Sequence, residues 1–520
     1  MKNFTFSLYG FHLRHTLTDA PDKVVADANL LWENLAKLGE KLLLFPGLRD
    51  LRSKLICYQN SQYDPKREQG RQTEWLTDSG KLDFGSIPTA EGFKIQGNLQ
   101  PFRLNDTYAA DLTLSPESPN ISIDVPQLKH FNPGCLLPSS IQASLGQTLW
   151  LYGEVDVSED CRVLAEKCAV ALLAGTPLNP VLANQDKLFG SLLFEYQATD
   201  PDDPQNPAKQ SHILVCLNNN KAPTLQLAGK AYDWLRDLLC CRHKILYVYQ
   251  EARNRYPDAR KLYSQLEKQM QDFPSLISDP KTRLEKLKEL LIKMPQDAVD
   301  YSRCLRDLKA HYTAISTNII NYRTNLEKIT AMGDSPKFWE DFLNRTCHQW
   351  QTQIQIDIEY LSPAQDLFQQ MIDTIRGMVE ILAEEQAQVR EQQDKERDRN
   401  LQTTIAVVGV GIGFTGLAAA SFPYLIPPDP KTPPIPLQPP FTSGFLHPFI
   451  SVLLLSLVFG FLGAGVAKGV TMLISSRSDK RAKLKSSTKN QLLNQANTPE
   501  VGQVTGVQQK VEIPTQPPGK

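Results

Sequence analysis

Residues 401–428, LQTTIAVVGVGIGFTGLAAASFPYLIPP, contain no charged side chain and are mostly apolar or small. A second uncharged run covers residues 445–467, and its apolar character continues to residue 474. A bilayer core of roughly 30 Å needs about 20 such residues in a helix. In lipid the backbone must satisfy its own hydrogen bonds, so each run should be helical. The sequence therefore predicts two transmembrane helices, at residues 401–426 and 445–474.

The residues around these runs predict a topology. The connection at residues 427–444 is rich in proline, which favours an extended outer loop. Basic residues lie on the other flank of each run, and by the positive-inside rule both termini are cytosolic. The tail, residues 475–520, begins with basic residues and is predicted to be disordered after them. Its basic residues set the topology or bind lipid headgroups of the bilayer: Arg477, Lys480, Arg481, Lys483 and Lys485. The predicted location is a membrane, crossed twice.

Both runs also carry small residues. Residues 411–416 match the GxGxxG pattern, but a dinucleotide site would need a preceding strand and a βαβ unit. Glycines four residues apart allow close approach of neighbouring helices, within one chain or between subunits. The alternative is that they only reflect the higher glycine content of membrane helices. The predicted assembly is a homo-oligomer. The candidate residues for helix packing or for lining a pore are Gly409, Gly413, Thr415, Gly416, Gly465 and Gly469.

The preceding 400 residues read as a cytosolic body in two parts. Residues 1–220 mix helical periodicity, as at 24–42 and 161–173, with short strand-like pieces such as 110–114, 121–123, 148–152 and 213–217. Residues 221–400 are helical, with one helix ending near Pro295, another at 301–322, and a long one starting after Pro363. The predicted fold class is an α+β domain, then a long-helix bundle or stalk, then two transmembrane helices.

Composition and motifs restrict the chemistry. A net charge of −1 over 520 residues gives no reason to expect a nucleic-acid partner. The nine cysteines show neither a disulfide framework nor CxxC spacing. Cys241 with His243, and Cys347 with His348, each supply only two groups to a metal, so structural roles are favoured. No catalytic motif is present, which predicts a protein that is not an enzyme, and the sequence assigns no cofactor or metal ligand.

This organisation, over residues 225–485, resembles the CorA-type divalent-cation channel superfamily. The resemblance implies a pentamer whose first span ends in Gly-Met-Asn, a motif that helps select hydrated Mg²⁺. Here the corresponding stretch reads GFTGL at residues 413–417 and SFPY at 421–424, so that motif is absent. The resemblance implies a divalent cation as a candidate partner.

Three functional hypotheses follow. The first is an oligomeric CorA-like cation channel or transporter with an altered selectivity region. The second is a membrane-anchored sensor or interaction protein whose two helices only anchor and oligomerise, favoured by the lack of acidic residues within the spans. The third, an enzyme within residues 1–220, has no motif in its support.

Overall fold

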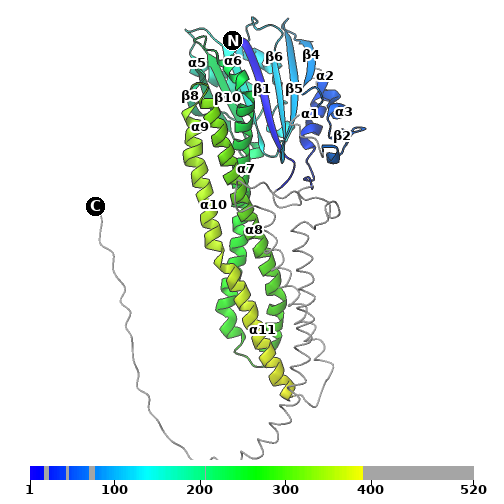
Figure 1. The fold of residues 1–520 in the computed structure, drawn as a ribbon, viewed down its shortest axis with the longest axis vertical. Coiled ribbons are helices and arrows are strands. Elements are labelled where there is room, and N and C mark those ends of the chain that lie inside the picture. The colour runs from blue at the N-terminus through cyan, green and yellow to red at the C-terminus, as the bar shows by residue number, and fades with distance from the viewer. Residues whose placement is uncertain (17–22, 42–45, 69–75, 205, 390–520) are drawn as a thin grey trace, which may run out of the picture. The chain divides into compact units, whose positions relative to one another are not determined.

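The computed structural model describes residues 1–389 except 17–22, 42–45, 69–75 and 205 (Figure 1). A sheet with short helices forms the N-terminal part, and long helices follow it. Both belong to one compact unit. The last strand ends at Asn218, and the first helix after it begins at Thr224.

The centre of the N-terminal part is an eight-stranded sheet with the order β4-β5-β6-β1-β7-β10-β9-β8. Only the β7–β10 pair is parallel, and the other neighbours are antiparallel. The strands are β1 (Lys2–Leu13), β4 (Leu82–Pro88), β5 (Lys94–Leu104), β6 (Thr107–Pro116), β7 (Gly146–Glu154), β8 (Val181–Leu188), β9 (Ser191–Ala198) and β10 (Ser211–Asn218). A separate hairpin is formed by β2 (Tyr58–Gln59) and β3 (Gln62–Tyr63).

Alternation along the strands separates the two faces of the sheet. Leu112 of β6 and Leu149 of β7 belong to the hydrophobic core that also contains residues of α1 (Leu30–Lys41) and α5 (Cys161–Leu172). Their neighbours Asp111 and Thr148 point to the opposite face, because successive side chains of a strand alternate. On that face they contact the first turns of α7 (Tyr232–Leu276).

Short helices complete this part of the chain. Asp160 caps the start of α5 by accepting hydrogen bonds from the backbone N–H groups of residues 162 and 163. The remaining short elements are α2 (Pro46–Arg49), α3 (Leu51–Lys54), η1 (Pro65–Glu68), η2 (Val125–His130), α4 (Pro138–Ile141), η3 (Pro207–Lys209) and α6 (Thr224–Lys230). Residues 121–123, predicted as a strand, are not one.

The helical part is an antiparallel pair, α7 and α8 (Arg283–Thr330), with a third line of helices along it (Figure 1). That line consists of α9 (Lys337–Asp341), the π-helical η4 (Phe342–Cys347), α10 (His348–Leu361) and α11 (Pro363–Val389). Buried residues of α8 recur at alternating spacings of three and four, the pattern of helices that pack side by side. They include Leu287, Leu291, Met294, Tyr301, Leu305, Leu308, Ile315, Ile319, Tyr322, Leu326 and Ile329.

The prediction that a helix ends near Pro295 is wrong. Pro295 lies inside α8, which joins the helix expected to end near Pro295 to the one expected at 301–322. Met294 before it and Tyr301 after it are both fully buried. Proline costs a helix roughly 3 kcal/mol, and the burial of this continuous apolar seam offsets that cost.

The predicted membrane architecture is also corrected. Among the helices that the structure describes, none combines the length and the apolar character needed to cross a bilayer. The longest uncharged run in α8, residues 310–322, is well short of the roughly 20 residues that a helix needs to cross a bilayer. The fold class with two transmembrane helices, the membrane location, and the functions as a channel or a membrane-anchored sensor are therefore not retained. The predicted spans 401–426 and 445–474, the loop 427–444 and the tail 475–520 lie outside the described residues.

Candidate functional site

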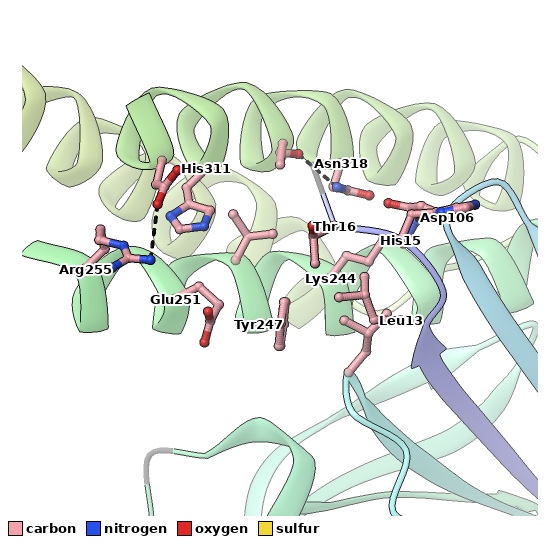
Figure 2. Close-up of a pocket in the computed structure, with 14 residues that line it drawn as sticks. Leu13, His15, Thr16, Asp106, Lys244, Tyr247, Glu251, Arg255, His311 and Asn318 are labelled. Carbon is pink, nitrogen blue, oxygen red and sulfur yellow. Dashed lines mark hydrogen bonds and ion pairs between the residues drawn. The ribbon is translucent and has the colours of Figure 1, made fainter. Parts of the chain in front are cut away.

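A cavity of about 130 Å³ lies where α7 and α8 meet the end of β1 (Figure 2). We call it the junction cavity. Three parts of the chain line it: residues 13–16 with Asp106 and Leu145 from the sheet, one face of α7, and one face of α8. At about 30 Å³ per water molecule in the liquid, this volume corresponds to roughly four water-sized groups, and it is close to the about 150 Å³ of a cavity that binds benzene.

Helical spacing brings the lining residues together. On α7 they are Lys244, Val248, Glu251 and Arg255, at spacings of four, three and four, with Tyr247 beside them. On α8 they are Asp307, His311, Ala314 and Asn318, with the same spacings. Residues three and four apart share one face of a helix, so each set forms a continuous wall.

Strand pairing supplies the third wall. The backbone N–H groups of Arg14 and His15 both donate to the carbonyl oxygen of Asp106, at 2.7 and 3.2 Å. These bonds hold the residues after β1 against the β5–β6 turn. His15 is held further, because its Nδ1 lies 2.9 Å from the carbonyl oxygen of Lys23 and its Nε2 contacts the Arg14 guanidinium.

Two ion pairs connect the walls of the cavity. Lys244 on α7 contacts the Asp106 carboxylate and so ties the helix to the sheet. Arg255 on α7 contacts Asp307 on α8, with Nη2 3.1 Å from Oδ2, and thereby joins the two helices (Figure 2). Asp307 also accepts from Arg306 at 2.7 Å. Both cations of the lining are therefore engaged by carboxylates.

Two polar groups of the lining, His311 and Glu251, have few or no partners among the described residues. The His311 ring extends from α8 toward α7 (Figure 2), and its buried Nδ1 has no hydrogen-bond partner among the described residues. Burial lowers the pKa of His311 to about 4, and the nearby Arg255 acts in the same direction, so the ring is neutral at pH 7. The Glu251 carboxylate accepts a single hydrogen bond of 3.4 Å, from Asn254. Burial, followed by the Glu251 charge, raises the pKa of Tyr247 to about 12.

A second group of polar residues includes two that are close in the chain to the cavity lining: Thr148 follows Leu145 by three positions, and His243 precedes Lys244. Thr148 Oγ1 lies 2.9 Å from His212 Nδ1 and 2.8 Å from His243 Nε2. His212 Nε2 lies 2.9 Å from Glu195 Oε1, which also accepts from Arg242 at 3.3 Å. We call Thr148, Glu195, His212, Arg242 and His243 the buried network.

The hydrogen-bond pattern determines the tautomers of this network. Burial raises the pKa of Glu195, but the bond from His212 and the charge of Arg242 outweigh it, and the pKa is about 2. The ionised carboxylate accepts from His212 Nε2–H, so His212 Nδ1 accepts from the Thr148 hydroxyl. Thr148 in turn accepts from His243 Nε2–H. Burial, followed by the Arg242 charge, lowers the pKa of His212 to about 4, which agrees with a neutral ring.

This arrangement of threonine, histidine and glutamate has the connectivity of a catalytic triad, but its burial points to a structural role. Thr148 is 0% exposed, and His212 and Glu195 are 3% and 4% exposed. A nucleophile needs access to its substrate, and this hydroxyl is enclosed. Its role is to join β7, β9 and β10 to α7.

The residues singled out by the sequence do not form this site. The glycine and threonine set (Gly409, Gly413, Thr415, Gly416, Gly465, Gly469) and the basic set (Arg477, Lys480, Arg481, Lys483, Lys485) lie outside the described residues. Cys241 and His243 are both buried, and His243 belongs to the buried network. Within the described ranges, no group of three or more His, Cys, Asp or Glu residues could hold a metal ion.

Sequence reasoning missed the junction cavity. The available signal was the repeated polar face of residues 244, 251 and 255, and of 307, 311 and 318, within otherwise apolar helical patterns. That signal alone does not distinguish a cavity wall from a solvated surface.

No protein-family model, curated protein or solved structure matches this chain. The resemblance to the CorA-type superfamily therefore stays a prediction. The same holds for the homo-oligomer, the divalent cation and lipid as partners, and the absence of enzymatic activity.

Proposed function

We propose that this protein binds a small polar molecule in the junction cavity, and that the bound molecule strengthens the attachment of α7 and α8 to the sheet. One observation carries the proposal. Polar groups from separate parts of the chain line one cavity, and two of them, His311 Nδ1 and the Glu251 carboxylate, have few or no partners within the described part of the chain.

Polar groups left without partners in a partly buried place are costly, at about 1–3 kcal/mol each. A ligand that supplies the missing hydrogen bonds recovers this free energy, which is why convergent polar groups in a cavity indicate binding. The ligand would contact α7 and α8 together, and residues 13–16 from the sheet. Binding would therefore stabilise the junction of all three parts.

Screening the purified full-length protein with small polar fragments by ligand-observed NMR tests this proposal. Fragments that bind the cavity should slow backbone amide exchange at residues 13–16 and in the cavity-facing turns of α7 and α8. Ala314→Leu fills part of the cavity and should abolish their binding. Thr317→Leu, on an exposed turn of the same helix, is the matched control and should leave binding unchanged. If Ala314→Leu blocks no fragment, the proposal is wrong.

A further inference from the structure

The ligand class follows from which groups of the junction cavity remain available. This inference rests on the proposed function. We infer that the cavity binds a small organic cation with N–H donors, an amine or a guanidine, through the Glu251 carboxylate and the neutral ring of His311.

The first argument is the charge balance. The lining contains three carboxylates and two cations. Two exposed residues outside the lining also contact these ion pairs: Arg306 binds Asp307, and Asp258 lies 3.4 Å from Arg255. With them included, four carboxylates face three cations: Asp106, Glu251, Asp258 and Asp307 against Lys244, Arg255 and Arg306. One carboxylate remains in excess.

The second argument identifies that carboxylate as Glu251. Asp106 is held by Lys244, and Asp307 by Arg255 and Arg306. Glu251 has only the long bond from Asn254, and it forms no ion pair with a described residue. An incoming positive charge therefore finds a counter-ion here without breaking an existing pair. An incoming anion would have to compete with carboxylates for Arg255 or Lys244.

The third argument concerns hydrogen-bond direction. The neutral His311 ring has one nitrogen without a hydrogen, and its unpartnered Nδ1 is an acceptor when Nε2 carries the proton. Asn318 donates from Nδ2 to the Ala314 carbonyl oxygen at 2.8 Å, which leaves its Oδ1 as an acceptor. The Glu251 carboxylate, His311 Nδ1 and Asn318 Oδ1 are thus three acceptors within one cavity, and together they favour a ligand that brings donors. Ammonium and guanidinium groups bring three to five N–H donors each.

A matched set of four-carbon probes tests the ligand class: 1,4-diaminobutane, 1,4-butanediol and succinate, with agmatine as the guanidine. We expect the diamine and agmatine to bind the full-length protein in calorimetric titrations, and succinate not to bind. Glu251→Gln should weaken diamine binding at least about tenfold, the usual effect of losing a charge-assisted hydrogen bond. Glu267→Gln makes the same change at an exposed site on α7, away from the cavity lining, and should have no effect. His311→Leu should weaken binding several-fold, and circular dichroism would check that each variant remains folded.

The outcomes separate this inference from the proposed function. If butanediol or succinate binds as well as the diamine, and Ala314→Leu still blocks it, the cavity is a binding site but the cation class is wrong. The same conclusion follows if Glu251→Gln leaves diamine binding unchanged. If Ala314→Leu abolishes the binding of neither these probes nor any other fragment, both proposals are wrong.

Discussion

Replacing Glu195 with glutamine removes the negative charge of the buried network and keeps the size of the side chain. Glu195 is 4% exposed and accepts from His212 at 2.9 Å, from Asn184 at 2.6 Å and from Arg242 at 3.3 Å. In Glu195→Gln the histidine can still donate to an amide oxygen. The Arg242 guanidinium, however, loses its only described carboxylate partner while it stays buried.

The size of the effect follows from the carboxylate pKa. The folded-state pKa of Glu195 is about 2, against 4.5 for an ordinary glutamate. Each pKa unit corresponds to about 1.4 kcal/mol, so folding favours the ionised carboxylate by about 3 kcal/mol. A similar range, about 3–5 kcal/mol, is typical for breaking a buried ion pair. We expect Glu195→Gln to lower the free energy of unfolding by about 3 kcal/mol at pH 7.

Urea denaturation followed by circular dichroism would measure this loss. Because the pKa is lowered on folding, the stabilisation is fully present above about pH 4.5 and is lost as the pH falls toward 2. The difference between wild type and variant should therefore shrink below pH 4.5. Glu159→Gln, at an exposed position before α5, is the control and should change stability by less than about 0.5 kcal/mol. A loss below 1 kcal/mol at pH 7, or one that does not depend on pH, would refute the role assigned to Glu195.

Three further predictions concern other parts of the molecule. Gly146→Ala should destabilise the protein by about 3 kcal/mol in thermal unfolding, because φ is +115° and the added Cβ would lie 2.7 Å from a buried histidine. Gly175→Ala is the control: φ is +83° and no atom lies within 4 Å, so it should cost only about 1 kcal/mol. Equal losses in the two variants would contradict the steric argument. Tyr249 and Trp350 stack at 4.4 Å and 7°, so a double-mutant cycle to alanine should give a coupling energy of about 1 kcal/mol, and a value near zero would show that the stack adds nothing. His311 has a folded-state pKa of about 4 against 6.5, so the unfolded state binds the proton first and this residue should lower stability by about 3 kcal/mol between pH 6.5 and 4. His212 acts in the same direction over the same range, so His311→Gln should reduce the pH dependence in urea titrations by about that amount without abolishing it, and an unchanged slope would contradict the role of His311.

Much of the local structure could be predicted from periodicity. The helix expected at 161–173 is α5 (Cys161–Leu172), and the long helix expected after Pro363 is α11, which begins at that proline. The strand-like pieces at 148–152 and 213–217 lie inside β7 and β10. These signals come from neighbouring residues, whose side chains alternate or repeat in a way that one element imposes by itself.

Two predicted helix boundaries differ from the structure. The helix expected from residue 24 begins at Leu30, and proline at 295 does not end α8. Local propensity was overridden there by packing, which a single segment does not reveal. The apolar runs after residue 400, which predict a membrane protein, lie outside the described residues, and none of the described helices is long and apolar enough to cross a bilayer.

By itself, the sequence determined that strands and short helices come first and that long amphipathic helices follow. It also placed polar residues on regular faces of those helices. Only the tertiary structure decided which polar residues meet. Lys244 reaches Asp106 across 138 positions of the chain, and Thr148 reaches His243 across 95. Such contacts depend on the strand order of the sheet and on how α7 and α8 pair. The junction cavity therefore exists only once both are in place, because its walls come from segments that nothing in their local sequence brings together.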